Sequence, residues 1–337
     1  MNKPFTKANA PSVTVVIPVF NGMSTLPACL DSLEAQDYPI PFEVIIVDDG
    51  SSDGSGDYAE SRGIKVIRQE NRGPGLARNA GVEAAEGEYL VFTDDDCILD
   101  TNFISEIVRS LPGTDVIGSQ GQIYSRQKSL VARFIHHELG ERYVLLNKNE
   151  YIDWVATYAA CYRKDVFEEI GGFNDTYSSE DCELSFRLAQ KGHKMIFAPR
   201  ARSQHKNFEN YFKFFRFKYK RAYWSIWLYK NFPARIVNDR LTPSSRKIMM
   251  LFMGLSAASF VAAALWRPAI YPGLAFAGAM LILTLPLTVK ILKKDFVLGL
   301  FTPFFLITRT VSYIFGVSRG LFDYWQGKRT VKKSASK

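Results

Sequence analysis

The sequence predicts an α/β domain with a mostly parallel sheet, followed by an α-helical membrane region. Two observations carry this prediction. Short β-rich apolar runs alternate with helical segments between residues 13 and 93, an order that builds parallel sheets with right-handed crossovers. Beyond residue 247, apolar stretches without charge reach the length that a helix needs to cross a bilayer.

The composition indicates a folded chain of one large or two smaller domains. Of its 337 residues, 47% are hydrophobic and 14% aromatic, which supplies apolar cores and excludes a disordered chain. The four cysteines form no CxxC pair, so neither a disulfide framework nor a zinc site is expected, and a reduced compartment fits. The polar residues 1–11 lack a signal-peptide core, so we expect a flexible N-terminus and a cytoplasmic first domain.

Four strands are expected in the first domain, each a short run rich in apolar and β-branched residues, and those at 13–19, 42–47 and 89–92 read as buried. The helices between them show apolar residues at helical spacing. The section from residue 103 to residue 197 is less regular. The expected strands are 13–19, 42–47, 64–68 and 89–92, and the expected helices include 26–36, 76–85 and 129–146.

Polar loops follow three of these strands, at residues 20–22, 48–51 and 94–96. Ligands of parallel sheets bind beyond the carboxyl ends of the strands. Carboxylates that converge there repel each other unless a cation or hydrogen-bond donors balance them. Oxygen ligands in a cluster suit Mg²⁺ or Mn²⁺. The acidic triplet at 94–96 alone also fits a surface turn, so the convergence of the loops is what predicts a site.

Residues 206–246 are expected to form amphipathic helices, because aromatic and basic side chains interleave there. Such a pattern can stack nucleic-acid bases or lie in a bilayer interface. The net charge of +8 suits nucleic acid, an anionic membrane surface or phosphate-bearing substrates. The apolar stretches that follow favour the membrane, so anionic lipids are the expected partners and nucleic acid is not.

The membrane region is expected at 247–325, with spans at about 248–266 and 269–289 that form a hairpin. A third apolar stretch, 296–317, contains Arg309. If it crossed the bilayer, the basic tail at 326–337 would lie outside, against the positive-inside rule. A re-entrant or interfacial segment is therefore favoured over a third span, which stays the alternative.

Five motifs follow one another along the chain: VVIPVFNG at 15–22, EVIIVDDGS at 43–51, NRGPGLARNAG at 71–81, TDDD at 93–96, and GGFN at 171–174 followed by Glu180-Asp181. In this order they resemble the motifs of the family 2 glycosyltransferases, which are inverting enzymes with the GT-A fold. TDDD looks like the DxD motif of that family, and Glu180-Asp181 like its ED motif. The resemblance covers roughly residues 12–225, and it implies a GT-A catalytic domain at 12–205.

This resemblance implies a UDP- or GDP-sugar donor, whose diphosphate leaving group needs a divalent cation, Mg²⁺ or Mn²⁺. Asp96 is the first choice of metal ligand, with Asp94 and His205, although which aspartate of the triplet binds the ion stays open. An exposed helical residue is the alternative for Arg78, and a structural histidine for His205. The residues expected to bind the donor are Pro18, Phe20, Asn21, Asp48, Asp49, Arg78, Asp94 and Asp95.

The resemblance also implies Asp181 as the catalytic base that removes the acceptor proton, with Glu180 orienting it or binding acceptor. Two acids favoured by a helix dipole are the alternative reading of this pair. Trp154 and Tyr158 are expected to line the acceptor pocket, with core packing as the alternative.

The expected protein is a hexosyltransferase-type enzyme that moves single sugars onto a lipid-linked or glycan acceptor, in cell-envelope, exopolysaccharide or glycolipid synthesis. Processive relatives carry Gln-x-x-Arg-Trp, whereas residues 220–224 read KRAYW here. We expect a multi-pass protein of the inner (plasma) membrane with a cytoplasmic catalytic domain. The alternatives are an enzyme that charges polyprenyl phosphate itself and, more distantly, a non-catalytic membrane scaffold.

Overall fold

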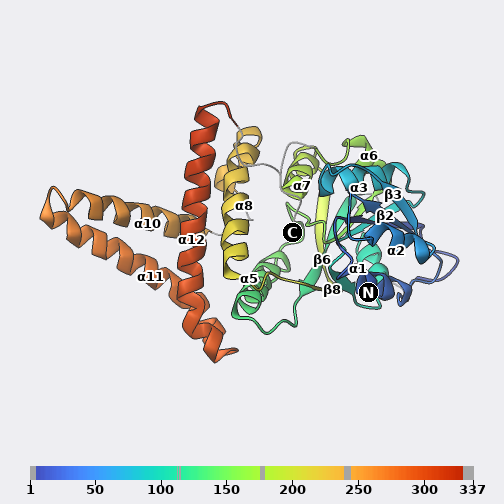
Figure 1. The fold of residues 1–337 in the computed structure, drawn as a ribbon, viewed down its shortest axis with the longest axis horizontal. Coiled ribbons are helices and arrows are strands. Elements are labelled where there is room, and N and C mark those ends of the chain that lie inside the picture. The colour runs from blue at the N-terminus through green and yellow to red at the C-terminus, as the bar shows by residue number, and fades with distance from the viewer. Residues whose placement is uncertain (1–4, 112, 114, 175–178, 239–243, 329–337) are drawn as a thin grey trace. The chain divides into compact units, whose positions relative to one another are not determined.

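A computed structural model of the chain describes residues 5–111, 113, 115–174, 179–238 and 244–328. The chain divides into two compact units (Figure 1). Unit 1 contains Met1–Arg126 and Leu139–Lys206, and unit 2 contains Gln127–Glu138 and Asn207–Lys332. Helix α5 (Leu130–Leu146) begins in unit 2 and ends in unit 1.

Unit 1 is built on one mixed sheet of eight strands among the described residues, in the order β3-β2-β1-β4-β7-β6-β8-β5. The β3-β2-β1-β4 half is parallel throughout, and β7 joins β4 antiparallel. The strands are β1 (Val13–Val19), β2 (Glu43–Asp48), β3 (Lys65–Arg68), β4 (Tyr89–Thr93), β5 (Cys97–Leu99), β6 (Val116–Tyr124), β7 (Ala159–Arg163) and β8 (Lys194–His205).

Both faces of this sheet are covered, because side chains alternate between two cores. Val15 and Ile17 of β1 pack into one core with α1 and α4, and Val16 packs into the other with α3 and α7. A strand buried on both faces reads as a continuous apolar run, which is why β1, β2 and β4 are found where the sequence predicted them. The edge strand β3 also lies where it was predicted, although its residues are partly exposed. The helices of unit 1 are α1 (Leu26–Glu34), α2 (Ser55–Ser61), α3 (Pro74–Glu83), α4 (Phe103–Arg109), α6 (Lys164–Glu169) and α7 (Glu180–Gln190).

The four cysteines of unit 1, Cys29, Cys97, Cys161 and Cys182, are all free thiols and all buried. Burial raises the pKa of the Cys29, Cys97 and Cys161 thiols above the ordinary value. These side chains act as small apolar groups, which agrees with the expectation of no disulfide framework.

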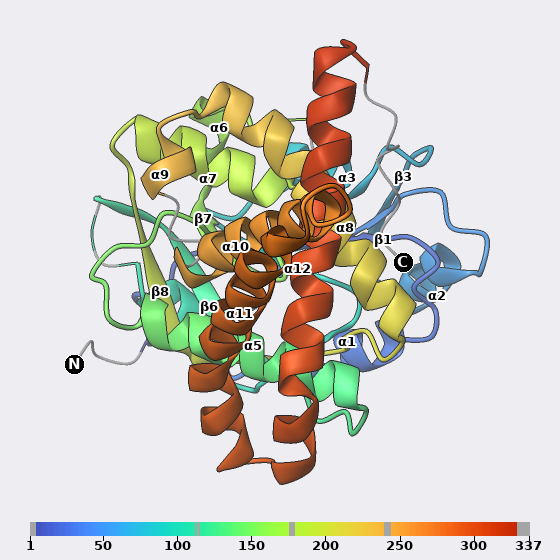
Figure 2. The ribbon, with the colours of Figure 1, turned by 90° about the vertical axis from the view of Figure 1, so that its left-hand side faces the viewer.

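The elements of secondary structure in the described residues of unit 2 are all helices. Three of its helices contain segments long and apolar enough to cross a membrane: Ser245–Ala262, Arg267–Leu292 and Phe296–Trp325. The first two run as a hairpin that projects from the other helices of unit 2 (Figures 1 and 2). The helices are α8 (Tyr211–Asn231), α9 (Arg235–Asn238), α10 (Ser244–Ala262), the 3₁₀ turn η1 (Arg267–Ala269), α11 (Ile270–Leu292) and α12 (Phe296–Trp325).

Two glycines let α12 approach α8 closely. A Cβ atom at Gly316 would lie 2.4 Å from the carbonyl oxygen of Tyr219, and one at Gly320 would lie 2.9 Å from that of Tyr223. Small residues at a helix–helix interface permit such backbone contact. This packing fixes the aromatic helix α8 along α12.

We expect Gly316→Ala to destabilise unit 2, because its methyl group overlaps the α8 backbone and overpacking typically costs about 1–3 kcal/mol. Gly278→Ala in α11 is the matched control, since a Cβ there meets nothing within 4 Å and alanine favours helix by roughly 1 kcal/mol. Thermal unfolding of both variants in detergent tests this. Equal midpoints for the two variants would show that the glycine contact is unimportant.

Candidate active site

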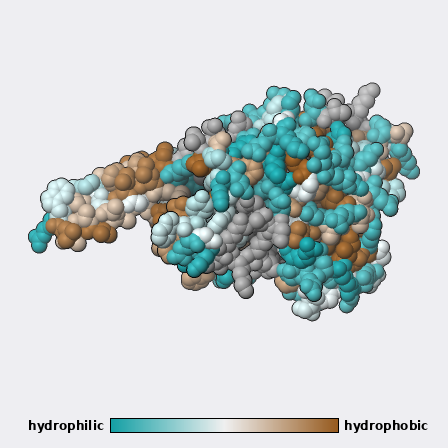
Figure 3. All heavy atoms as spheres, turned by 90° about the horizontal axis from the view of Figure 1, so that it is seen from above, coloured by the Kyte–Doolittle hydropathy of each residue, from teal (hydrophilic) through white to brown (hydrophobic). Residues whose placement is uncertain are grey.

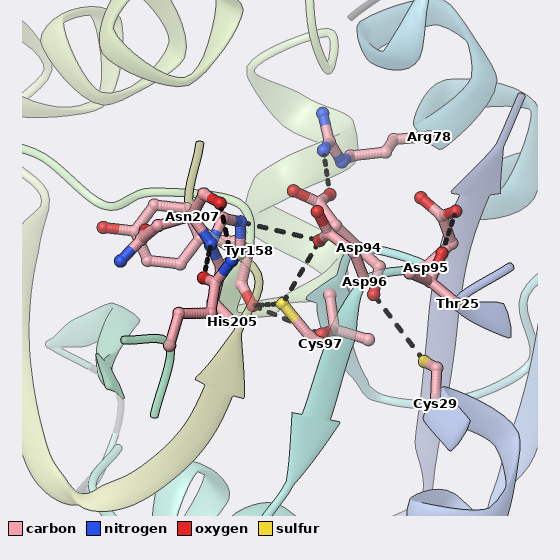
Figure 4. A network of polar contacts seen from close by, with 12 residues as sticks. Thr25, Cys29, Arg78, Asp94, Asp95, Asp96, Cys97, Tyr158, His205 and Asn207 are labelled. Atoms are coloured by element: carbon pink, nitrogen blue, oxygen red, sulfur yellow. Dashed lines mark hydrogen bonds and ion pairs between the residues drawn. The ribbon is translucent and has the colours of Figure 1, made fainter. Parts of the chain in front are cut away.

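The site lies at the end of β4, where Asp94, Asp95 and Asp96 point to three different partners (Figure 4). Asp94 pairs with Arg78, Asp95 accepts a hydrogen bond from Thr25 (3.1 Å), and Asp96 faces His205. The triplet is therefore not a loose acidic turn. Each carboxylate has its own environment, and so its own chemistry.

Asp96 and His205 form the part of the site best suited to a metal ion. The Asp96 carboxylate and His205 Nε2 lie 3.5 Å apart. Together with the Cys97 thiol, their ligand atoms all lie within 4.8 Å of one another. The other ring nitrogen of His205, Nδ1, is buried with no hydrogen-bond partner in the described part of the chain.

The local backbone explains how these residues meet. Cys97 opens β5 directly after Asp96, and the antiparallel pairing of β5 with β8 sets Cys97 opposite His205. The sequence does not predict the pairing of strands whose paired residues are 108 positions apart. Cys97 was therefore not predicted as a neighbour of the metal site. Its signal was only its place beside the triplet.

The electrostatics of Asp96 favour a cation. Burial raises the pKa of Asp96 to about 6, an effect that His205 opposes and that the Asp94 and Asp95 charges reinforce. A bound divalent ion would supply the positive charge that this carboxylate lacks. Mg²⁺ and Mn²⁺ prefer oxygen and imidazole nitrogen to a thiol, so Asp96 and His205 fit as ligands. Cys97, whose buried thiol has a raised pKa, packs beside them.

Arg78 joins the two acidic motifs of the site. Its guanidinium contacts Asp94 at 2.7 Å and Glu180 at 3.2 Å, and only 3% of its side chain is exposed. Burial alone would lower the pKa of Arg78, yet the charges of Asp94 and Glu180 outweigh it and raise that pKa. Arg78 is therefore not the exposed helical residue that the sequence left as an alternative.

Glu180 and Asp181 begin helix α7 and differ in their surroundings. Burial raises the pKa of Glu180, with Arg78 opposing that change and Asp181 adding to it. An Asp181 carboxylate oxygen accepts a hydrogen bond from the Cys182 backbone N–H at 2.8 Å. Since Arg78 engages Glu180, Asp181 is the member of the pair without an ion pair among the described residues.

Asp48 and Asp49 are buried at the end of β2 and organise the neighbouring loops. Asp48 accepts a hydrogen bond from the Ser51 backbone N–H at 2.8 Å. Asp49 accepts from the backbone N–H groups of Arg72 and Gly73, both at 2.8 Å, and from the Gln69 amide. The Asp49 carboxylate thus holds the turn that leads into α3.

The first loop is tied to the second by Asn21. Its backbone has φ of 52°, a left-handed conformation that asparagine tolerates better than most residues, and its side-chain oxygen accepts from the Ser52 N–H at 2.9 Å. Phe20 beside it is partly exposed, whereas Pro18 is buried within β1 opposite Val47. Contacts of Pro18 to a ligand would have to involve its backbone.

The two aromatic residues expected near the acceptor differ in position. The Tyr158 ring lies 5.8 Å from the His205 ring, and its carbonyl accepts from Thr93 at the end of β4. Trp154 is 3% exposed, and the Arg142 guanidinium covers its ring at 3.6 Å. Tyr158 therefore borders the Asp96–His205 pair, while Trp154 lies within a packed region.

If His205 holds a metal ion, His205→Gln should lower Mn²⁺ affinity by about tenfold or more, since even indirect partners of metal ligands are worth 10–100-fold. His193→Gln, near the start of the same strand, is the control. Isothermal titration of the purified chain with MnCl₂ measures both. Unchanged affinity in His205→Gln would exclude His205 as a ligand.

Comparisons with known proteins find similar glycosyltransferases. Residues 14–171 match the family model described as Glycosyl transferase family 2. The glycosyltransferase AglE of Haloferax volcanii is 29% identical over an alignment of 206 positions that covers 56% of this chain and 64% of that protein. The glycosyltransferase GlyA of Streptococcus pneumoniae is 32% identical over 204 residues, covering 55% of this chain and 29% of GlyA. The matches thus cover less than two thirds of these relatives.

A solved structure extends the likeness beyond unit 1. A mannosyltransferase from Pyrobaculum calidifontis, in complex with GDP-Man and Mn²⁺, aligns with a TM-score of 0.61 at 20% identity, covering 95% of this chain and 90% of that one. At this identity the likeness shows the fold, a GT-A-like mixed sheet followed by C-terminal helices.

Proposed function

We propose that the chain, whose residues 14–171 match the model of glycosyl transferase family 2, moves one sugar from a nucleotide-diphosphate sugar to a membrane-proximal acceptor hydroxyl. The observation that carries the proposal is the division of the acidic groups. Asp96 and His205 lie on one side, Glu180 and Asp181 on the other, and buried Arg78 connects them through Asp94 and Glu180.

The donor side would receive the diphosphate. Asp96 and His205 would hold a divalent cation, Mg²⁺ or Mn²⁺, which supplies charge neutralisation to the departing diphosphate. Asp48 lies buried at the end of β2, which β1 separates from β4 in the sheet. Asn21 is hydrogen-bonded to Ser52 in the loop that follows β2. These loops and Asp95 would contact the base and ribose of a UDP- or GDP-sugar.

The acceptor side would carry out the proton transfer. Asp181 takes the proton from the acceptor hydroxyl as its oxygen forms a bond to the anomeric carbon. The bond from that carbon to the diphosphate breaks on the opposite face, which inverts the configuration. Glu180 would position Asp181 rather than take the proton, because its own carboxylate already contacts the Arg78 guanidinium.

Membrane association is proposed from unit 2. In the most apolar windows of α10 and α11, only 11% and 22% of the residues are buried, against 50% in α12. Hydrophobic residues, mixed with less hydrophobic ones, form much of the visible surface of the α10–α11 hairpin (Figure 3). Arg246 and Lys247 at its start and Lys290 and Lys293 near its end share one side of the bilayer if both helices cross, and this side is cytoplasmic by the positive-inside rule.

We therefore propose two spans, with α12 lying in the interface beside α8. Arg309 near the middle of α12 is buried against Glu138, and an arginine at the centre of a span is costly. The exposed apolar side chains of α12, such as Phe301 and Phe315, would face the lipid. The setting that fits is the inner face of a plasma membrane, in cell-envelope or glycolipid synthesis.

A polyprenyl phosphate is the second candidate acceptor, favoured by the basic side chains of α8 and by the net charge of +8. A phosphate oxygen is already anionic, so its attack needs no catalytic base. Dependence on Asp181 thus separates the two kinds of acceptor.

The test is sugar transfer by the full chain in detergent, with a panel of UDP- and GDP-sugars and with lipid-linked glycan or polyprenyl phosphate as acceptor. We expect one donor to be used, with activity lost on chelation of divalent ions and restored by Mn²⁺. No turnover and no binding of any donor would leave the non-catalytic scaffold as the better description.

A further inference from the structure

A cluster of four charged side chains lies inside unit 2. None of these residues has a role in the sugar transfer proposed above. Glu138 of α5 contacts Lys218 of α8 at 2.6 Å, Arg309 of α12 at 2.8 Å and Arg246 of α10 at 3.2 Å. Four helices (Figure 1) thus send one charged side chain each to a common point. We call this group the Glu138 cluster.

The positive charges of the Glu138 cluster exceed the negative charge of its one carboxylate. Among the described residues, Glu138 is the one carboxylate in ion-pair contact with Lys218, Arg246 and Arg309. Three cations and one anion leave two positive charges, and arginines do not give up their protons in proteins. Exposed fractions of 7% to 14% for these side chains make the excess costly without a counter-ion.

The hydrogen bonds of the cluster are incomplete as well. The Nε atoms of both Arg246 and Arg309 are buried and have no partner in the parts of the chain that the structure describes. Arg309 is more than nine-tenths buried. The Glu138 carboxylate cannot serve these donors, because it already receives Lys218 and one terminal nitrogen from each arginine.

The chemistry that completes the cluster is that of a phosphate. Phosphate oxygens accept paired hydrogen bonds from guanidinium groups and supply the missing negative charge. Exposed apolar side chains flank the basic residues along the helices: Phe217 next to Lys218, and Ile248 and Leu251 after Arg246, are 41%, 40% and 57% exposed. An anion with a hydrocarbon chain would contact both the basic and the apolar side chains, whereas a free ion would contact only the basic ones.

We propose that the Glu138 cluster binds the phosphate group of a membrane lipid, with Arg246 and Arg309 donating to its oxygens and the apolar side chains of α8 and α10 contacting its chains. Glu138 contacts both arginines and competes with the phosphate for their N–H groups. The inference rests on the membrane association proposed above, and it does not require sugar transfer.

The probe is dioleoylphosphatidic acid, added to the purified full chain in detergent and counted on the protein by native mass spectrometry. Dioleoylglycerol has the same chains without the phosphate, and inorganic phosphate has the headgroup without the chains. We expect phosphatidic acid to remain bound, dioleoylglycerol not to, and inorganic phosphate to compete only in large excess. Equal retention of the two lipids would overturn the proposal, and equally strong binding of inorganic phosphate would overturn its lipid part.

The variants separate a binding site from a structural ion pair. Arg309→Gln should lower retention of phosphatidic acid about tenfold, while Arg267→Gln, exposed at the tip of the α10–α11 hairpin, should not. Glu138→Gln should retain the lipid as well or better, because it removes the competing carboxylate. Retention by Arg309→Gln equal to that of Arg267→Gln, or loss in a folded Glu138→Gln, would overturn the proposal.

Folding is checked by far-UV circular dichroism and a monodisperse elution profile. If Arg309→Gln does not fold, Arg309→Lys replaces it, and it is expected to lose the paired hydrogen bonds and several-fold in retention. Because the readout is lipid binding, a chain that binds the lipid but transfers no sugar would contradict the proposed function alone, and the reverse result would contradict this inference alone.

Discussion

Asp181→Asn is expected to reduce transfer to a hydroxyl acceptor by about 10²–10⁴-fold, the usual contribution of a general base. The asparagine keeps the size of the side chain and a carbonyl oxygen for the Cys182 N–H, so the start of α7 should stay intact. The measurement is initial rate with saturating donor, together with donor affinity, which should change little.

A control variant and a second acceptor complete this experiment. Asp165→Asn changes an aspartate in the first turn of another short helix, α6, that pairs with Arg163 at the surface; it should leave the rate unchanged. Full activity of Asp181→Asn with a hydroxyl acceptor would refute the base assignment. If Asp181→Asn were fully active with polyprenyl phosphate but not with a hydroxyl acceptor, polyprenyl phosphate would be an acceptor that needs no catalytic base.

Arg78→Met should lower the free energy of unfolding by about 3–5 kcal/mol, the typical cost of removing one partner from a buried ion pair. Methionine keeps the apolar stem but leaves Asp94 and Glu180 facing each other without the cation. For a unit of this size, each 1 kcal/mol corresponds to roughly 2–4 °C in the unfolding midpoint. Differential scanning calorimetry of the purified chain measures the shift.

Arg62→Met is the matched control, because Arg62 also bridges two acids, Asp31 and Glu34, whose side chains are 66% and 64% exposed. Surface pairs are worth about 0–1 kcal/mol, so its midpoint should move little. Similar shifts in the two variants would mean that Arg78 gains nothing from its position between the acidic motifs.

The sequence predicted the parallel half of the sheet and its acidic edge because its strands are short runs rich in apolar residues, and β1, β2 and β4 are buried on both faces. It missed β6, whose buried residues include Ser119 and Gln120. Gly118 and Gly121 also interrupt the run, where a Cβ would lie 2.9 Å from the Tyr162 ring and 2.8 Å from the Ala201 carbonyl oxygen. A strand whose glycines allow close contact with neighbouring residues, and which has few apolar side chains, shows no hydrophobic periodicity in the sequence.

The candidate site shows the same division. The residue types at the strand ends identified Asp94, Asp95 and Asp96, and the resemblance added Glu180, Asp181 and His205. The partners of each residue depend on long-range contacts. The bridge of Arg78 to Glu180 joins residues far apart in the chain, and no spacing rule within one element contains that information.

The burial of all four thiols gives a practical means to establish membrane topology. Thiolate is the reactive form of cysteine, and burial raises the pKa of Cys29, Cys97 and Cys161, so maleimide reagents should label the native chain slowly. Single cysteines introduced at the hairpin tip or after α12 would then report alone. The unmodified chain would provide a nearly silent background, with no need to remove its own cysteines first.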